Sequence, residues 1–373
     1  MKVVVAPNSM KGSLNAFDFA DAVEQAFLEC SSEFEIRKIP VADGGDFTGE
    51  VLMRNLGATE KQMAVVGPLR QTVLSKYAVS GAKAIIEMAD ASGMKLVRSS
   101  DLDPLVATSY GTGQLIADAL KNGCTEIYLA IGGSATVDGG MGMMEALGFV
   151  FSDKDGATLA GNGANLCKIH AVKSADISEE VSIKIICDVD NPLLGENGAA
   201  NVFGPQKGAT KEMVPILEEG LENWAQVILD KTGHDLKAIE GTGAAGGMAL
   251  PLMGFLNAEI VPGADFVLEQ LNFAEQVSWA DIVITGEGKI DSQTLNNKAP
   301  FAVAKSAKKY GKPVFAIGGK VESFTSDIFD GVYSLVNGPL SLEYAMNNAQ
   351  QLLYNFSKEL AKTIYALRIK EQE

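Results

Sequence analysis

Apolar residues fall along the chain in short unbroken runs that alternate with helical stripes. Such runs are typical of strands buried on both faces of a parallel sheet, and short clusters of glycines follow several of them. They occur at Lys2–Ala6, Ile36–Val41, Ile127–Ile131, Ile183–Val189, Ala280–Thr285, Pro313–Ile317 and Val332–Val336. The alternation of these runs with helical segments predicts an α/β protein.

Helical spacing is clear near both ends of the chain. The first helix would begin after an N-cap at Ser13, and its buried face would hold Ala16, Phe19, Val23 and Phe27. The tail from about Leu342 is expected to be one helix. Its apolar stripe, which indicates ordinary core packing, consists of Leu353, Phe356, Leu360, Ile364 and Leu367. Further helices are expected after Thr112, at 214–229 and at 301–310.

The middle of the chain has a different pattern. Residues 65–88 alternate between apolar and polar positions, which predicts antiparallel strands about a turn at Gly81. The length of 373 residues suggests two α/β domains. We expect residues 63–280 to form a domain inserted into a discontinuous α/β domain of residues 1–62 and 281–373, whose two segments share one sheet.

Charge limits the kinds of partner. With 31 basic and 47 acidic residues the formal net charge is −16, which argues against nucleic acid and anionic membranes as partners. An anion site would have to be built locally, from backbone N–H groups, a few lysines and metal ions. Four cysteines without CxxC spacing indicate reduced thiols, and no apolar run is long enough to cross a membrane, so a cytoplasmic protein is expected.

Most sequence signatures of nucleotide and nucleophile chemistry are missing. The chain has no P-loop motif, no protein-kinase catalytic loop and no G-x-S-x-G elbow, and its two histidines lack neighbours suited to a zinc or Ser-His-Asp site. One G-x-G-x-x-G occurs at Gly241, Gly243 and Gly246, after a poor strand. It leaves open an NAD-dependent dehydrogenase, but a glycine-rich turn over a neighbouring domain is the favoured interpretation.

A second glycine-rich segment, Ile131 to Gly140, links an apolar run to a helical pattern. Its small residues allow close backbone approach, and N–H groups at a helix entry form an anion cradle when hydroxyls stand beside them. A tight turn without a ligand is the other interpretation. We favour a phosphate site formed by Gly132, Gly133, Ser134 and Thr136.

Carboxylates follow several of the buried runs, next to glycines. In that position they suit Mg²⁺ binding or proton abstraction from a hydroxyl, although a single such residue often caps a helix or forms a turn. These residues are Asp43, Asp188, Asp190, Glu287 and Asp291. Lys11 precedes a helix start, where a cation favours a carboxylate or phosphate, and Lys207 is either a second anion ligand or a solvated loop charge.

Short motifs in a fixed order span almost the whole chain. They are Ala-Pro-Asn-Ser-Met-Lys-Gly-Ser-Leu from Ala6, Pro-Val-Ala-Asp-Gly-Gly from Pro40, Ile-Glu-Met-Ala from Ile86, Ser-Gly from Ser92, Tyr-Gly-Thr-Gly from Tyr110, Gly-Gly-Ser-Ala-Thr from Gly132, Cys-Asp-Val-Asp-Asn-Pro-Leu from Cys187, Phe-Gly-Pro-Gln-Lys-Gly-Ala from Phe203, Gly-Thr-Gly-Ala-Ala-Gly-Gly from Gly241, and Thr-Gly-Glu-Gly from Thr285 with Asp291 and Gln293-Thr294. In this order they resemble the motifs of the type 1 glycerate kinases, a bacterial glycerate 2-kinase-like family.

The resemblance implies an ATP-dependent transfer of phosphate to D-glycerate, with the 2-hydroxyl as the favoured acceptor. It also implies two α/β domains around a cleft, one of them flavodoxin-like with a parallel sheet. The expected partners are ATP with Mg²⁺ and a small hydroxy acid, and the expected state is a monomer or a homodimer.

Roles for the acid substrate follow on this interpretation. Lys11 and the turn from Asn8 to Ser13, which includes Ser9, would hold the carboxylate of glycerate or the transferring phosphate. Asp43, Glu287 and Asp291 complete the expected substrate site.

Roles for catalysis, metal and ATP involve other segments. Asp190 would accept the hydroxyl proton with Asp188 beside it, and Asp43 and Asp188 would hold Mg²⁺. Lys207 would bind the ATP phosphates together with Gly132, Gly133, Ser134 and Thr136.

Some positions depart from the family's usual pattern. Asn8 stands where an Asp is common, Met10 replaces an aromatic residue, and Phe47 stands where a glycine would allow close backbone approach. These changes keep one alternative open: a non-catalytic or altered-substrate homologue that binds a sugar acid.

Overall fold

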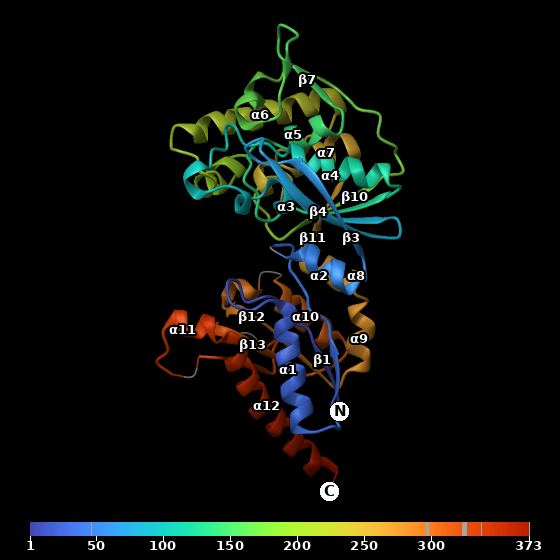
Figure 1. The fold of residues 1–373 in the computed structure, drawn as a ribbon, viewed down its shortest axis with the longest axis vertical. Helices are drawn as coiled ribbons and strands as arrows, with labels where there is room; N and C mark the ends of the chain where they lie inside the picture. Colours follow the sequence, from blue (N-terminus) through green and yellow to red (C-terminus); the bar gives the residue numbers. More distant parts are fainter. Residues whose placement is uncertain (46, 296–297, 323–326, 337, 373) are drawn as a thin grey trace. The chain divides into compact units, whose positions relative to one another are not determined.

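The computed structural model describes residues 1–45, 47–295, 298–322, 327–336 and 338–372, and the chain forms two compact units (Figure 1). Unit 1 contains residues 1–43 and 263–373, and unit 2 contains residues 44–262. Unit 2 is therefore inserted between the two segments of unit 1. The chain passes between them earlier than the expected boundaries at 62/63 and 280/281. The reason is that α2 (Thr48–Asn55) contacts β5 (Lys83–Glu87) of unit 2. In addition, α8 (Gly263–Gln270) and α9 (Phe273–Trp279) pack on α10 (Ala299–Lys309) of unit 1.

A parallel sheet forms the centre of unit 1. In the described residues it has five strands, in the order β14-β13-β12-β1-β2. They are β1 (Lys2–Val5), β2 (Glu35–Lys38), β12 (Ile282–Ile290), β13 (Val314–Val321) and β14 (Gly331–Ser334). Counted within the unit from the β2 edge, this is the flavodoxin-like order 2-1-3-4-5. The flavodoxin-like domain implied by the resemblance is confirmed.

Helices cover both faces of this sheet, because alternate residues of a strand point to opposite sides. Val3 and Val5 of β1 lie in one buried cluster with residues of α1 (Ala16–Cys30) and α12 (Ala349–Gln372). Val4 lies in another cluster, with residues of α8, α9 and α10 (Ala299–Lys309). The apolar run at the start of the chain is therefore a strand buried on both faces.

Two helix predictions in unit 1 need correction. The N-cap of α1 is Asn15, whose side chain accepts hydrogen bonds from the N–H groups of Phe17 and Asp18, whereas Ser13 donates its hydroxyl proton to the Met10 carbonyl. The tail is two helices, α11 (Leu342–Asn347) and α12, because the chain breaks helix at Asn348. Leu367, predicted on the buried stripe, is exposed.

Unit 2 contains a mixed sheet in the order β11-β10-β6-β5-β4-β3. Its strands are β3 (Thr59–Val66), β4 (Thr72–Ser80), β5 (Lys83–Glu87), β6 (Glu126–Ala130), β10 (Ser182–Cys187) and β11 (Glu259–Pro262). The pairs β3–β4 and β4–β5 are antiparallel, and Gly81 at φ +61° forms the predicted turn between β4 and β5. The other pairs are parallel, so the carboxyl ends of β5, β6 and β10 lie along one edge. A small antiparallel sheet contains β7 (Val150–Ser152), β8 (Thr158–Leu159) and β9 (Ala171–Lys173).

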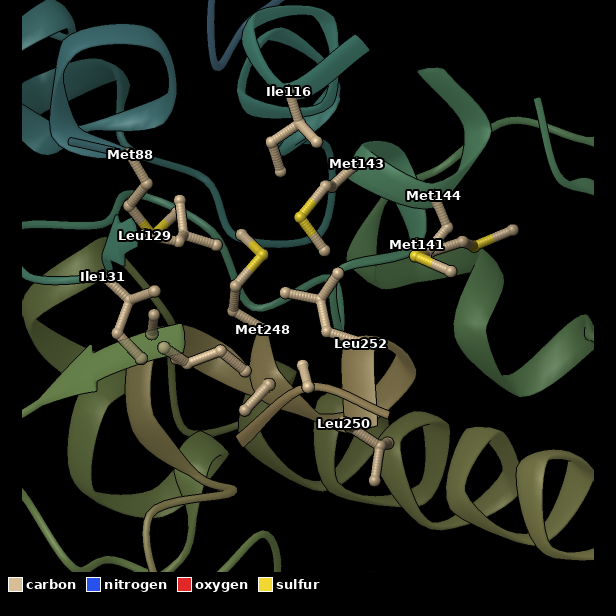
Figure 2. Packing of buried hydrophobic residues seen from close by; sticks show 14 of the residues in the cluster. Met88, Ile116, Leu129, Ile131, Met141, Met143, Met144, Met248, Leu250 and Leu252 are labelled. Atoms are coloured by element: carbon tan, nitrogen blue, oxygen red, sulfur yellow. The ribbon is translucent and has the colours of Figure 1, made fainter. Parts of the chain in front are cut away.

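A methionine-rich core supports the loop at residues 132–140. Ile131 and Met141, on either side of this loop, are both buried. Figure 2 shows them in one cluster with Met88, Leu129, Met248 and their neighbours. The helices of the unit are α2, α3 (Ala89–Ser92), α4 (Tyr110–Lys121), α5 (Met141–Ala146), α6 (Met213–Thr232) and α7 (Ala249–Leu256). The loop is thus fixed at both ends by packed side chains.

Short helical turns complete the secondary structure. The 3₁₀ turns are Met94–Leu96, Ser99–Asp101, Gly163–Lys168, Pro205–Lys207, Ala244–Gly246 and Ser292–Leu295, and a π turn spans Ala199–Phe203. Within the part of the chain that the structure describes, no helix has the length and apolarity that a membrane crossing requires.

Candidate active site

The first group of candidate residues lies in unit 1, at the carboxyl end of the sheet. From β1 the chain moves to β2 on one side, and from β12 it moves to β13 and β14 on the other, so the strand order reverses between β1 and β12. Ligands of open α/β sheets bind beside such a reversal. Asn8 follows β1 at this point, and its N–H donates to the Gly286 carbonyl of β12 at 2.8 Å.

Asn8 also links two strand ends. It is buried, and its Nδ2 donates to Oδ2 of Asp43, beyond β2, at 3.1 Å. Its Oδ1 accepts from the N–H of Ser9 at 2.8 Å. An ionised aspartate at position 8 could make only the second of these bonds, since a carboxylate is an acceptor without a donor. The asparagine therefore fits its surroundings and holds Asp43 at the site.

Glu287 is the most perturbed group of this cluster. It is 6% exposed, and the Thr294 hydroxyl donates to its Oε1 at 2.7 Å. The N–H of Asp291 in turn donates to the Thr294 oxygen at 3.1 Å. Burial raises the pKa of Glu287 to about 7; the Thr294 bond and Lys298 oppose this, and the charges of Asp43 and Asp291 add to it. A carboxyl group in this range can take up and release a proton at neutral pH.

The turn from Asn8 to Ser13 connects β1 to α1. Met10 and Leu14 pair through their backbones, Gly12 adopts φ +76°, and Ser13 closes the turn with its bond to the Met10 carbonyl. Lys11 is exposed on this turn. The structure thus brings Asn8, Asp43, Glu287 and Asp291 together, with Lys11 on the turn that Asn8 begins.

The second group lies in unit 2, on the loop after β6. Asp138 in this loop is fully buried and accepts hydrogen bonds from Ser109 through both its N–H (2.8 Å) and its hydroxyl (2.7 Å). The N–H groups of Gly140 and Gly142 also donate to Asp138, each at 3.2 Å. Burial raises the pKa of Asp138, and these donors oppose the rise. Asp138 therefore fixes the loop to the start of α5.

Lys207 is buried and donates hydrogen bonds to the same loop. It is 2% exposed, and its Nζ donates to Oγ of Ser134 at 2.6 Å and to the carbonyl of Thr136 at 2.8 Å. Burial lowers the pKa of Lys207 to about 7, against the nearby charge of Asp138. The alternative of a solvated loop charge is wrong. A contact with ATP phosphate stays a prediction, to which the structure adds a role in holding the loop.

The glycines at 241–247 serve backbone packing within unit 2. A Cβ on Gly243 would lie 2.1 Å from the Pro192 carbonyl oxygen, and a Cβ on Gly246 would lie 2.2 Å from that of Thr136. Gly139 donates its N–H to the Gly246 carbonyl at 3.0 Å. The segment covers the 132–140 loop of its own unit. No strand is described between α6 and Gly241, so the strand that should lead directly into a dinucleotide motif is missing from the described residues.

Asp188 and Asp190 lie beyond the end of β10. The strand stops at Cys187, two residues before the predicted end at Val189, because the chain turns there and the Cys187 thiol donates to the Val189 carbonyl. Both aspartates are exposed. Neither residue belongs to the strand, and the roles of both remain predictions.

Three residues of the site were not predicted from the sequence. Glu87 ends β5, accepts the N–H of Gly49 at 2.9 Å through its Oε1, and has its pKa raised to about 7 by burial. It follows the buried Ile85 and Ile86, the same signal that marked the other carboxylates. Thr294 and Asp138 lie in motifs in which other residues were predicted to have functional roles. Their contacts depend on the fold and gave no separate signal.

Comparison with known proteins agrees with this picture. Residues 3–365 match the model of the glycerate kinase family. The chain is 42% identical to a glycerate kinase of Halalkalibacterium halodurans, over 96% of this chain and 97% of that protein. It is 41% identical to a glycerate 2-kinase of Escherichia coli, over 98% of each. A crystal structure of a presumed glycerate kinase 2 from Salmonella typhimurium LT2 superposes with a TM-score of 0.89 at 40% identity, over 99% of both chains. These matches show that the chain belongs to the glycerate kinase family and that it is a kinase.

Proposed function

We propose that the protein transfers the γ-phosphoryl group of ATP to the 2-hydroxyl of D-glycerate and forms 2-phosphoglycerate. Family membership supports the reaction class, and the Escherichia coli relative, a glycerate 2-kinase, supports the position of transfer. The observation that carries the proposal in the structure is the cluster at the strand reversal of unit 1, in which Asn8, Glu287 and Asp291 are buried and Asp43 is partly buried. A kinase needs such groups to position a hydroxyl and to accept its proton.

The loop after β6 supplies the groups that would bind the phosphates of ATP. No described residue accepts a hydrogen bond from the N–H of Gly132 or Gly133. Because Oγ of Ser134 accepts a hydrogen bond from Lys207, its own hydroxyl proton is left to donate elsewhere. The Thr136 hydroxyl is buried, and no described group pairs with it. Donors without partners are what a phosphate requires of a binding loop.

Two assignments of the proton acceptor compete. The sequence favoured Asp190, with Asp188 beside it. The structure adds Glu287 as a second candidate, because its environment holds its pKa near neutrality and Thr294 orients it. In either case Lys11 and the turn from Asn8 to Ser13, with Ser9, would bind the carboxylate of the acid or the transferring phosphate.

The proposed reaction also requires a magnesium ion that arrives with the nucleotide. Mg²⁺ in kinases is usually held by one or two carboxylates together with substrate phosphates, rather than by a protein cage. The described residues contain no group of three His, Cys, Asp or Glu side chains arranged to hold a metal. Asp43 and Asp188 are the carboxylates that would hold the ion, which neutralises charge on the transferring group. A cytoplasmic monomer or homodimer completes the proposal.

The position of transfer is tested by the product. Enolase accepts 2-phosphoglycerate directly, whereas 3-phosphoglycerate must first be converted by a mutase. With ATP, Mg²⁺ and D-glycerate, a coupled assay containing enolase but no mutase should therefore report turnover. Signal that appears only after mutase is added would refute transfer to the 2-hydroxyl.

A further inference from the structure

A pocket of about 300 Å³ opens in unit 2 at the carboxyl ends of β5 and β6. One wall contains Gly132 and Gly133, where the proposed phosphate loop begins, and another contains Phe47. The remaining lining residues are Gly45, Glu87, Ala89, Met94, Lys95 and Ala130. The volume is at the lower end of the range in which proteins bind small organic ligands.

Phe47 has a backbone conformation that costs energy. It lies before α2 with φ 68° and ψ 9°, in the left-handed region that a bulky residue seldom adopts. The neighbouring bonds enforce this turn: Thr48 donates its hydroxyl to the Gly45 carbonyl at 2.8 Å, and Val51 donates its N–H to the Phe47 carbonyl at 3.0 Å. A glycine would adopt the same conformation without strain. A phenylalanine here therefore needs a reason outside the folding of the turn.

The side chain of Phe47 gives no such reason by packing. It is 49% exposed, and it lies outside the buried hydrophobic clusters of the described residues. Its ring borders the pocket instead. Strain of this kind, held in place by surrounding bonds, is a recurrent feature of ligand sites.

The pocket combines flat apolar surface with hydrogen-bonding groups. Phe47 and Met94 supply the apolar part. Glu87 accepts the Gly49 N–H with Oε1, and no described residue bonds its Oε2. Gly132 and Gly133, at the start of the proposed phosphate loop, border the pocket on another side. A flat heteroaromatic ring with a polar edge matches this set, because Phe47 offers a stacking face and the carboxyl of Glu87 offers a contact at the edge of the ring.

We infer that this pocket is the subsite for the adenine base of ATP, with Phe47 as its stacking surface and Glu87 at the edge of the base. The inference rests on the proposed function, in which the adjoining loop binds the phosphates. The base would enter beside Gly132 and Gly133, and the phosphates would follow the loop toward Ser134 and Thr136.

The test uses Phe47→Gly and Phe47→Tyr in the full-length protein. Adenosine is the probe, by calorimetry, because it lacks phosphates and needs no turnover. Loss of a stacking ring typically weakens binding by about 5- to 100-fold. The glycine variant should raise the Kd of adenosine and the KM of ATP by at least about fivefold, with the KM of D-glycerate within about twofold. The tyrosine variant keeps a ring and should stay within about twofold of the wild type for all three.

Stability separates loss of stacking from damage to the fold. Because glycine relieves the strain at position 47, Phe47→Gly should melt no lower than the wild type. Arg70→Gly is the matched control, since Arg70 also has a positive φ of 63° in unit 2 but does not line the pocket. It should leave adenosine binding unchanged.

The outcomes distinguish this inference from the proposed function. Adenosine binding that depends on Phe47, in a protein that does not phosphorylate glycerate, would support the base subsite and refute the acid substrate. Glycerate kinase activity with adenosine affinity unchanged in Phe47→Gly would overturn the base subsite alone. A wild-type protein that fails to bind adenosine would also overturn it.

Discussion

Replacing Lys207 with methionine tests whether this buried lysine holds the loop after β6. The methionine keeps most of the apolar stem and removes the ammonium group that bonds Ser134 and Thr136. Both acceptors are buried, and leaving a buried acceptor without its donor costs about 1–3 kcal/mol. The two lost bonds together should destabilise the folded state by about 2–6 kcal/mol.

A second effect acts in the opposite direction and depends on pH. The pKa of Lys207 falls from 10.5 to about 7 on burial. At about 1.4 kcal/mol per pKa unit, keeping the buried lysine charged costs the folded state about 4–5 kcal/mol. Between these two values the unfolded chain binds more protons than the folded chain, so this group makes the wild type more stable as pH rises. The variant lacks this gain. Near pH 7 the cost of burying the charge nearly cancels the contribution of the two hydrogen bonds, so wild type and variant should have similar free energies of unfolding. Between pH 7 and pH 9.5 the free energy of unfolding of the wild type should increase by about 3 kcal/mol relative to that of the variant.

Urea unfolding at several pH values measures this difference directly, and steady-state kinetics report on the loop. Since Ser134 and Thr136 lose their support, the KM of ATP should rise at least about tenfold in Lys207→Met. Lys168→Met is the matched control, because Lys168 is exposed and bonds only the side chain of Asn165 in the described structure. If the stability difference is constant from pH 7 to 9.5 and the KM of ATP stays within about twofold, the loop-holding role is refuted.

Three further predictions concern the groups around the acid substrate. Glu287→Gln should lower kcat by about 10²–10⁴-fold if Glu287 accepts the proton, and normal turnover would exclude Glu287 as the base. Because burial raises the pKa of Glu287 to about 7, the wild type loses stability as pH rises through this range, and the melting temperature of the variant should rise relative to the wild type between pH 5 and pH 8. Lys11→Ala should cut kcat/KM at least about a hundredfold, roughly 2.7 kcal/mol, in a folded protein, and a loss below about threefold would make Lys11 a surface charge. Of Asp188→Asn and Asp190→Asn, the second should abolish turnover with little change in melting temperature; if both variants keep near-normal kcat, the base is sought at Glu287.

The main elements of the fold could be predicted from the sequence, because buried parallel strands need continuous apolar runs. Val3, Val4 and Val5 are fully buried in β1, as their run predicts. Element ends were less predictable. Ser13 and Asn15 are both good N-caps by residue type, and only the backbone geometry gives the role to Asn15. The unit boundaries were missed because they depend on which unit α2, α8 and α9 pack against.

The candidate site shows a similar division. Carboxylates after buried strands marked Asp43, Glu287 and Asp291, and the structure places them at one sheet edge. Burial and partners could not be predicted, since they come from residues distant in sequence. Lys207 bonds atoms more than 70 residues away, and nothing local distinguishes it from a solvated lysine.

The most direct test of the account is ADP formation by the purified protein with ATP and Mg²⁺, measured across a panel of small hydroxy acids. A glycerate kinase should show turnover that requires D-glycerate, exceeds turnover with the other acids, and stops when EDTA removes the divalent metal. Binding of D-glycerate and ATP without ADP formation would contradict it and would indicate the non-catalytic homologue instead.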